Sequence, residues 1–185
     1  MGKIEDAIER ADQESFTRQP PKTLKGQISY LIRQLGSAKA VAQEIGVTAD
    51  SVNRYRRGAR KHARADVAAK IDDGVRQRWQ PQVRRRRQRQ AATATGITVE
   101  TRARFGYTAP VGTTDDGRFR RLTVHLPPAY AQRLFDARDT GASDQEMRGI
   151  VAEGFKEIYF QDGGGRAAGL SDVTLNDIDY LDLDY

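Results

Sequence analysis

The sequence predicts an α+β protein with three parts: a helical N-terminal half that contains a helix-turn-helix, a basic helical connector, and a C-terminal small sheet with two helices. Apolar residues recur at helical spacing in the first half, whereas from Ile97 onward they alternate with polar residues as in a strand. Charge is also uneven, because residues 54–121 carry 19 basic and 6 acidic side chains and residues 122–185 carry 5 and 12. These differences predict small domains of unlike character.

Composition excludes several classes of protein. The chain has 185 residues, no cysteine and a net charge of +6. A disulfide scaffold, a cysteine-ligated metal site and a large enzyme are thereby excluded. No apolar run approaches the roughly 20 residues that cross a bilayer, and the acidic, amphipathic start MGKIEDAIERADQ is unlike a signal peptide. We therefore expect a cytoplasmic protein without a membrane anchor.

The first two expected helices flank a proline pair. Apolar residues lie at helical spacing over residues 4–11 and again over residues 24–35, and Pro20 and Pro21 separate the two stretches. Both stretches predict amphipathic helices, each with one face directed to a core.

The most informative local pattern is the segment SAKAVAQEIGVTADSVNRYRRG. Ser37 can cap a short helix, Gly46 permits a left-handed turn, and Thr48 can cap a second helix. This is the spacing of a helix-turn-helix, with Val52 and Tyr55 of the second helix in its core. The second helix would then present to a DNA major groove the outward residues Thr48, Ala49, Asp50, Asn53, Arg54 and Arg57.

An ordinary helical hairpin also fits so short a pattern. DNA binding is favoured because basic residues cluster on and just after the second helix, at Arg54, Arg56, Arg57, Arg60 and Lys61. Asn53 and Arg54 are the expected base readers, since asparagine can pair with adenine and arginine with guanine or a phosphate. Asp50 argues against a tight phosphate contact at the start of this helix.

The connector, residues 63–95, is strongly basic. Residues 76–89 include seven arginines, of which four are consecutive: Arg84, Arg85, Arg86 and Arg87. No acidic residue lies between Asp73 and Glu100, whereas a merely soluble charged face usually alternates its signs. We therefore expect a solvated helix or a disordered arm that binds DNA phosphates, with a kink or a helix end at Pro81.

The C-terminal half begins with two expected strands. Residues 97–107 alternate in polarity, and residues 118–126 do so as well. The intervening PVGTTDDG is rich in turn formers, so a hairpin or an exposed loop is the simplest arrangement. Two helices should follow, one starting at the proline pair Pro127 and Pro128 and one capped by Ser143.

The end of the chain is expected to be a glycine linker followed by an acidic tail, LNDIDYLDLDY. Because tyrosine or leucine alternates with aspartate, the tail could form an edge strand whose acids discourage aggregation, or it could dock on a basic partner. The expected domains are residues 1–62 for the helix-turn-helix, 63–95 for the connector, 96–162 for the α+β domain and 163–185 for the linker and tail.

The sequence offers little autonomous chemistry. His62 and His125 are the only histidines and neither has a local partner for acid–base catalysis, so both are expected to be structural. The adjacent pairs Asp72 with Asp73 and Asp115 with Asp116 could hold a metal ion, but such pairs more commonly cap helices or turns. No glycine-rich phosphate loop or zinc motif occurs. An enzyme is therefore not expected.

Thr113 and Thr114 lie between glycines and acids in the expected turn. On local pattern alone they most simply form hydrogen-bonded turn caps. A threonine hydroxyl is a poor nucleophile until a base or a metal ion removes its proton, and no histidine or lysine lies near this turn. Any reaction at these hydroxyls would therefore need machinery from a partner.

The chain resembles the terminal proteins that cap the telomeres of linear actinomycete chromosomes and plasmids. The resemblance runs nearly end to end, through segments that occur here as IEDAIERA, KAVAQEIGVTADSVNRYRRG, RQRWQPQVRRRRQRQAA, GITVETRARFGYTAPVGTTDDGRFRRLT, LPPAYAQRLFDAR, IVAEGFKEIYFQDGG and DIDYLDLDY. Because these segments occur in the same order and at similar lengths, the resemblance is specific to this family.

This resemblance implies a non-catalytic protein primer. A threonine hydroxyl of the family becomes covalently linked to the DNA 5′ end when a DNA polymerase fills in the recessed telomere, and the matching residue here is Thr114. Local chemistry alone does not separate Thr114 from Thr113. The implied partners are telomeric DNA, a telomere-binding recruiting protein and the polymerase. No intrinsic cofactor is implied, because magnesium would belong to the polymerase, and self-association stays open. The expected location is the nucleoid, at chromosome or plasmid ends.

A helix-turn-helix transcriptional regulator with a C-terminal dimerisation or ligand-sensing domain is the competing interpretation. Both interpretations predict DNA binding, but they differ at the ends of DNA. A primer protein stays on telomeric fragments through phenol extraction, whereas a regulator dissociates in salt and protects an internal, usually palindromic, operator. The turn hydroxyl and the unbroken arginine run favour the primer.

Overall fold

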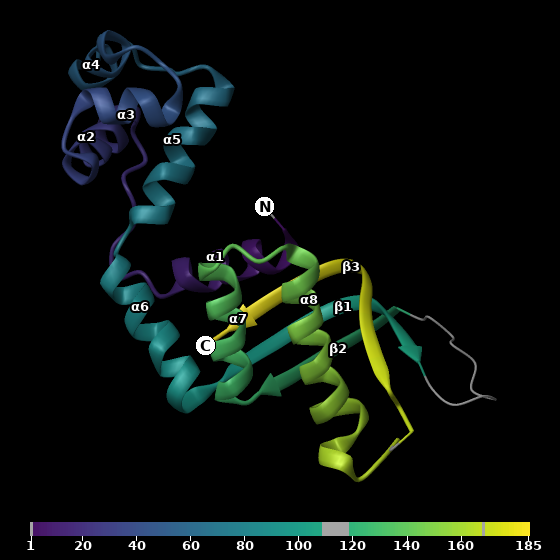
Figure 1. Ribbon diagram of the computed structural model, residues 1–185. Coiled ribbons are helices and arrows are strands. Elements are labelled where there is room, and N and C mark those ends of the chain that lie inside the picture. Colours follow the sequence, from purple (N-terminus) through teal and green to yellow (C-terminus); the bar gives the residue numbers. More distant parts are fainter. Residues whose placement is uncertain (1, 109–118, 168) are drawn as a thin grey trace. The chain divides into compact units, whose positions relative to one another are not determined.

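A computed structural model describes residues 2–108, 119–167 and 169–185 of the chain (Figure 1). It contains helices together with a three-stranded antiparallel sheet, so the predicted α+β class is confirmed. The chain divides into two compact units, which we call the helical unit (residues 16–82) and the mixed unit (residues 1–15 and 83–185). No helix in the described ranges is long and apolar enough to cross a membrane.

The helical unit consists of α2 (Leu24–Leu35), α3 (Ala38–Ile45), α4 (Ala49–Arg57) and α5 (Ala65–Arg78). Apolar side chains from all four helices share one core, and Ile28, Ile45, Val52 and Ile71 are each at most 1% exposed. The apolar periodicity that predicted these helices therefore marks their core faces.

Hydroxyl caps begin α3 and α4. The side chain of Ser37 accepts a hydrogen bond of 3.1 Å from the backbone N–H of Ala40, and that of Thr48 accepts one of 3.2 Å from Ser51. Gly46 ends α3 with a φ of 73°, in the left-handed region where a side chain is strained. The predicted caps and turn are confirmed.

The sheet of the mixed unit has the order β2-β1-β3. The central strand β1 (Ile97–Thr108) pairs antiparallel with β2 (Phe119–Leu126) and with β3 (Asp172–Asp184), which confirms the first two strands as predicted. Gly96 precedes β1 with a φ of 73°, and a Cβ there would lie 2.2 Å from the carbonyl oxygen of Leu126. Only glycine fits at this entry to the sheet.

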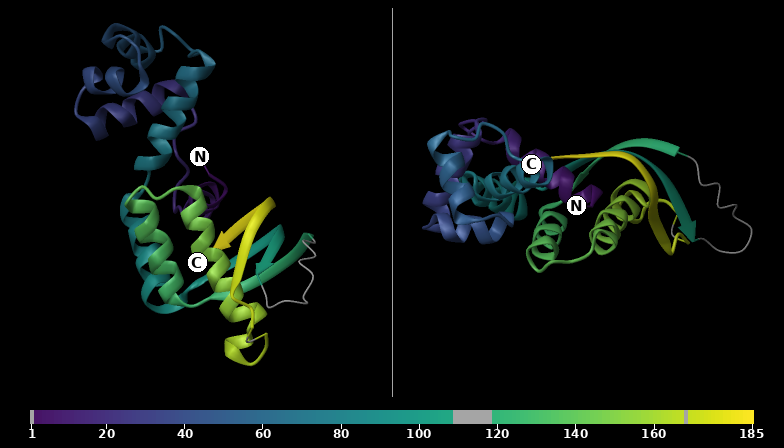
Figure 2. Two further views of the ribbon diagram at one scale, coloured as in Figure 1. Left: turned by 45° about the vertical axis from the view of Figure 1, so that its right-hand side comes forward. Right: turned by 90° about the horizontal axis from the view of Figure 1, so that it is seen from above.

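Helices α7 (Pro128–Asp139) and α8 (Asp144–Gly154) lie along one face of the sheet (Figure 2). A π-helical turn, η2 (Phe155–Phe160), and a short 3-10 helix, η3 (Asp162–Gly164), follow α8. The other helical segments of the unit are α1 (Lys3–Glu14), α6 (Pro81–Gln90) and the π-helical η1 (Ala91–Thr95). Apolar residues from α1, α7, α8, η2 and all three strands form the core of this unit.

For three segments, the unit in which the segment packs differs from the predicted domain. The first helix, expected beside the helix-turn-helix, packs in the mixed unit, where Ile4 and Ile8 are 0% exposed. The expected connector is divided, since α5 belongs to the helical unit and most of α6 to the mixed unit. The tail forms the edge strand β3 of the mixed unit, which is one of its two predicted arrangements. The periodicity of apolar residues shows which face of a helix is buried, but it does not show in which of the two cores that face is buried.

Candidate nucleic-acid interfaces

The outward face of α4 carries the polar residues that the sequence assigned to DNA. Arg54 and Arg57 are exposed and Asn53 is half-buried, whereas Val52 and Tyr55 are 0% and 4% exposed. Because a residue advances about 100° around a helix, Asn53, Arg54 and Arg57 share one face and the two apolar residues share another. The structure thus brings the predicted base readers together on one accessible surface.

Two polar contacts modify this surface. The Nε of Arg54 lies 2.9 Å from Oδ2 of Asp50, and both side chains are at least 49% exposed. Exposed pairs of this kind contribute little to stability, so Arg54 can exchange the carboxylate for a base or a phosphate. Thr48 is already engaged, since its hydroxyl accepts from the Ser51 N–H and donates to the Ser51 Oγ at 3.0 Å. A DNA contact by Thr48 would compete with its role as the helix cap.

The helical unit is strongly basic as a whole. Its residues 16–82 include 14 basic and 5 acidic side chains, a net charge of +9, whereas the mixed unit has 17 and 20, a net charge of −3. Positive charge continues past α4 in the exposed residues Arg56, Arg57, Arg60 and Lys61. Attraction of a polyanion therefore concentrates on this unit.

The structure corrects the role of Arg84, which the sequence assigned to phosphate binding. Its guanidinium donates two hydrogen bonds of 2.7 Å to the carboxylate of Glu9 and one of 3.1 Å to Asp12. The Arg84 side chain is 11% exposed. The side chain holds α6 against α1 and does not face solvent, so it is not available to DNA.

Asp12 is the centre of this buried network, and it is 0% exposed. It accepts hydrogen bonds from Gln88 at 2.9 Å and from the hydroxyl of Tyr185 at 2.7 Å, and Arg138 lies 3.6 Å away. Burial and the charge of Asp12 together raise the pKa of Tyr185. Sequence reasoning missed this network, although Gln88 follows Arg84 by one helical turn and so shares its face.

The pKa values of the Glu9–Arg84 pair follow from their contacts. Burial alone would raise the pKa of Glu9, but the hydrogen bonds from Arg84 and Gln13 and the nearby positive charges hold it below its ordinary value. Burial alone would lower the pKa of Arg84, but the hydrogen bond and charge of Glu9 raise it. Both groups are therefore charged near neutral pH.

The remaining arginines of the run are differently placed. Arg85, Arg86 and Arg89 are exposed, and Arg87 is half-buried. The Nε of Arg87 is buried and has no hydrogen-bond partner among the residues that the structure describes. Phosphate binding requires an accessible guanidinium. This condition is met by Arg85, Arg86 and Arg89, and by only part of the Arg87 guanidinium.

The threonine turn lies outside the described residues. Thr113, Thr114 and the two aspartates that follow them belong to the segment 109–118. The strands on either side pair in register from Ile97 with Leu126 to Arg104 with Phe119. The expected attachment of DNA at Thr114 therefore rests on the sequence alone.

Two other titratable residues, His125 and Asp72, have local contacts. The Nδ1 of His125 lies 3.1 Å from the hydroxyl of Thr98 on the neighbouring strand, and Asp72 accepts a hydrogen bond from Gln27. Within the described ranges, no three acidic, histidine or cysteine side chains come together as metal ligands would.

Comparison with known proteins adds no relative. No protein-family model, no curated protein and no solved structure matches the chain.

Proposed function

We propose that the protein is a DNA-binding terminal protein of linear replicons, which becomes linked to the DNA 5′ end and primes end-patching synthesis. The observation that carries DNA binding is the accessible polar face of α4 within a unit of net charge +9. The assignment to telomeres, to a recruiting protein and to a partner polymerase is carried by the near end-to-end resemblance. The location that follows is the nucleoid, at the ends of a chromosome or plasmid.

We propose further that α3 and α4 form a helix-turn-helix, with α4 as the helix that enters the major groove. Three residues join the two helices, Gly46 takes the left-handed turn, and Ala42 is 5% exposed in the shared core. These features support the motif because its helices must cross closely and turn sharply. Asn53 and Arg54 would read bases, and Arg57 would contact a base or a phosphate.

The proposed attachment makes the protein a substrate. The hydroxyl oxygen of Thr114 attacks the α-phosphorus of a deoxynucleoside triphosphate, a phosphoester bond forms, and pyrophosphate leaves. The hydroxyl proton passes to a base or to water in the polymerase site. Metal ions of the polymerase would stabilise the charge that develops on the phosphate, and magnesium is thus the partner's cofactor.

Covalent labelling tests this proposal. Wild type, Thr114→Ala and Thr113→Ala are each incubated with the telomere-binding partner, polymerase, magnesium and a labelled nucleotide, and protein-bound label is counted after denaturation. Wild type and Thr113→Ala should be labelled, whereas Thr114→Ala should not. Label on Thr114→Ala but not on Thr113→Ala would move the attachment to Thr113.

A transcriptional regulator is the second candidate, because the basic face of α4 alone would also suit an operator. A footprint on an internal palindrome, with no label on wild type when every priming component is present, would favour this candidate. Protein that stays on terminal DNA fragments after phenol extraction would favour the primer.

A further inference from the structure

One face of the sheet carries α7 and α8, and the described elements of the mixed unit leave the opposite face uncovered (Figure 2). We call this opposite surface the open face. Antiparallel pairing directs opposed residues to the same side of a sheet, so the pairs Arg104 with Phe119 and Arg102 with Arg121 lie together on it. The alternate residues Ala103 and Leu122 are buried on the core side.

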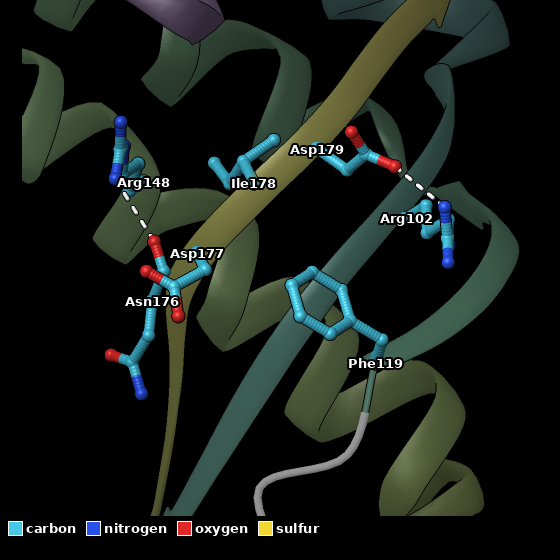
Figure 3. Close-up of a pocket in the computed structure, with 7 residues that line it drawn as sticks. All are labelled: Arg102, Phe119, Arg148, Asn176, Asp177, Ile178 and Asp179. Carbon is cyan, nitrogen blue, oxygen red and sulfur yellow. Dashed lines mark hydrogen bonds and ion pairs between the residues drawn. The ribbon is translucent and has the colours of Figure 1, made fainter.

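The exposure of Phe119 on the open face is not explained by the stability of the sheet. Phe119 is 45% exposed, although a phenylalanine normally contributes to stability by burial. The guanidinium carbons of Arg102 and Arg104 lie 5.7 and 5.1 Å from the centre of its ring. The close-up in Figure 3 shows the ring of Phe119 extending from the start of β2 beside Arg102. The sheet therefore presents an exposed aromatic ring with two guanidinium groups close to it.

A second aromatic residue lies in the next row of the same face. The guanidinium of Arg121 lies 5.9 Å from the ring centre of Tyr180, and the Tyr180 hydroxyl donates to Glu100 at 2.9 Å. In this row Arg121 of β2 and Tyr180 of β3 lie on either side of Arg102 of β1.

The arginines of the open face are paired with carboxylates that a stronger anion could replace. Arg102 lies 2.8 Å from Asp179 and Arg104 lies 3.4 Å from Asp177, and all four side chains are at least 48% exposed. Solvent-exposed ion pairs contribute little net free energy, so a phosphate that also brings a stacking partner can exchange with these acids.

We propose that the open face binds single-stranded nucleic acid, with one base stacked on Phe119 and the backbone phosphates contacted by Arg102, Arg104 and Arg121. Stacking needs the flat side of a base, which is accessible only where the strand is unpaired. Arginines beside an aromatic ring supply the matching charge for the phosphates, and they add cation–π contacts to the base.

The acids of β3 set the direction of the bound strand. Asp177, Asp179, Asp182 and Asp184 lie along this edge of the sheet and repel phosphates. A hollow of about 510 Å³ is lined by Phe119 and Arg102, by Arg148 of α8, and by residues 176–179 of β3 (Figure 3). The strand therefore follows β2 and β1, with a base directed toward the hollow.

The test measures oligonucleotide binding by the uncoupled, full-length protein without a polymerase. Fluorescence anisotropy follows a labelled thymidine homopolymer and, separately, a duplex. Phe119→Ala should weaken binding to the homopolymer by at least about fivefold and leave duplex binding unchanged, whereas Phe119→Tyr should retain it. Tyr159→Ala is the matched control, because Tyr159 is equally exposed, at 44%, but lies on η2 away from the arginine pair.

The arginines give a second readout. Arg104→Gln should flatten the dependence of homopolymer affinity on salt by about 0.7 in the logarithmic slope, which is the loss of one phosphate contact to a single strand. Arg166→Gln, at an exposed side chain on the segment after η3, should leave the slope unchanged. Circular dichroism melts of each variant show that it is folded.

Several results would overturn the proposal. Phe119→Ala with wild-type affinity for the homopolymer would do so, and so would an equal loss on duplex and homopolymer. Displacement of the homopolymer by an aspartate-rich peptide, with no effect of Phe119→Ala, would assign the face to an acidic protein partner. None of these results depends on nucleotide attachment, so this proposal and the priming proposal can fail separately.

Discussion

Replacing Arg84 with glutamine should separate folding from DNA binding within the run of four arginines. Arg84 and its neighbour Arg85 are adjacent in sequence, but only Arg84 is buried, with its guanidinium on Glu9 and Asp12. Arg84→Gln removes that positive charge while keeping a polar side chain that favours a helix. Arg85→Gln removes the same charge from an exposed position and is the matched control.

The expected cost follows from burial. The side chains of Arg84, Glu9 and Asp12 are 11%, 17% and 0% exposed, so two carboxylates would lose their main partner in a poorly solvated site. Breaking a buried ion pair by removing one partner costs about 3–5 kcal/mol, because the remaining charge is uncompensated. Arg138 and Gln88 would still lie 3.6 and 2.9 Å from Asp12. We therefore expect the lower end, about 3 kcal/mol in the free energy of unfolding.

Urea denaturation can be read separately for the two units. Trp79 is the sole tryptophan and lies in the helical unit, so its fluorescence reports that unit, while far-ultraviolet circular dichroism reports both. Arg84→Gln should shift the dichroism transition of the mixed unit to lower urea and leave the fluorescence transition in place. It should leave the salt dependence of DNA binding unchanged.

Arg85→Gln should behave in the opposite way. Its urea transitions should match wild type, and the logarithmic salt slope of duplex binding should fall by about 0.9, the loss of one phosphate contact. Wild-type stability of Arg84→Gln, or a loss of salt slope equal to that of Arg85→Gln, would refute the assignment of Arg84 to folding.

The remaining predictions concern α4 and pH. Val52→Asp would place an unpaired charge in the core of the helical unit and should lower its free energy of unfolding by several kcal/mol. DNA binding and the helical circular dichroism signal should be lost with it. A native melting temperature would contradict the burial of Val52. Asn53→Ala or Arg54→Ala should each cost about 1–3 kcal/mol on a preferred duplex and little on random DNA, and equal losses on both would reduce α4 to a phosphate contact. The folded protein holds the pKa of Glu9 below its ordinary value of 4.5, so the stability it contributes is present above that pH and should be lost as the pH falls through the lowered pKa. A urea series against pH should show this loss in wild type and a flatter profile in Arg84→Gln.

Local pattern was sufficient for most of the secondary structure. The caps at Ser37 and Thr48 and the turn at Gly46 were predictable because each depends on a hydroxyl or a glycine within a few residues of the helix end. The strands before and after residues 109–118 were predictable from alternating polarity. The outward face of α4 followed from the same periodicity, so the candidate DNA-reading residues were predictable too.

The open face of the sheet could be predicted only in part. Alternation in the segment TRARF shows that Arg102 and Arg104 point away from the core side of their strand. That Phe119 lies opposite Arg104 depends on the register of β1 with β2, which is not encoded in either strand alone.

The sequence by itself determined most of the helices, the first two strands, the apolar face of each, and the distribution of positive charge, because these are properties of neighbouring residues. The tertiary structure alone decided which core receives α1, which arginine of the run is buried, and which strand lies at the edge of the sheet. Arg84 and Arg85 are chemically identical, and they differ only because α1 brings Glu9 and Asp12 against one side of α6. A contact between residues more than 70 positions apart leaves no trace in local periodicity, so packing selects which of two identical side chains supports the fold and which stays exposed to solvent.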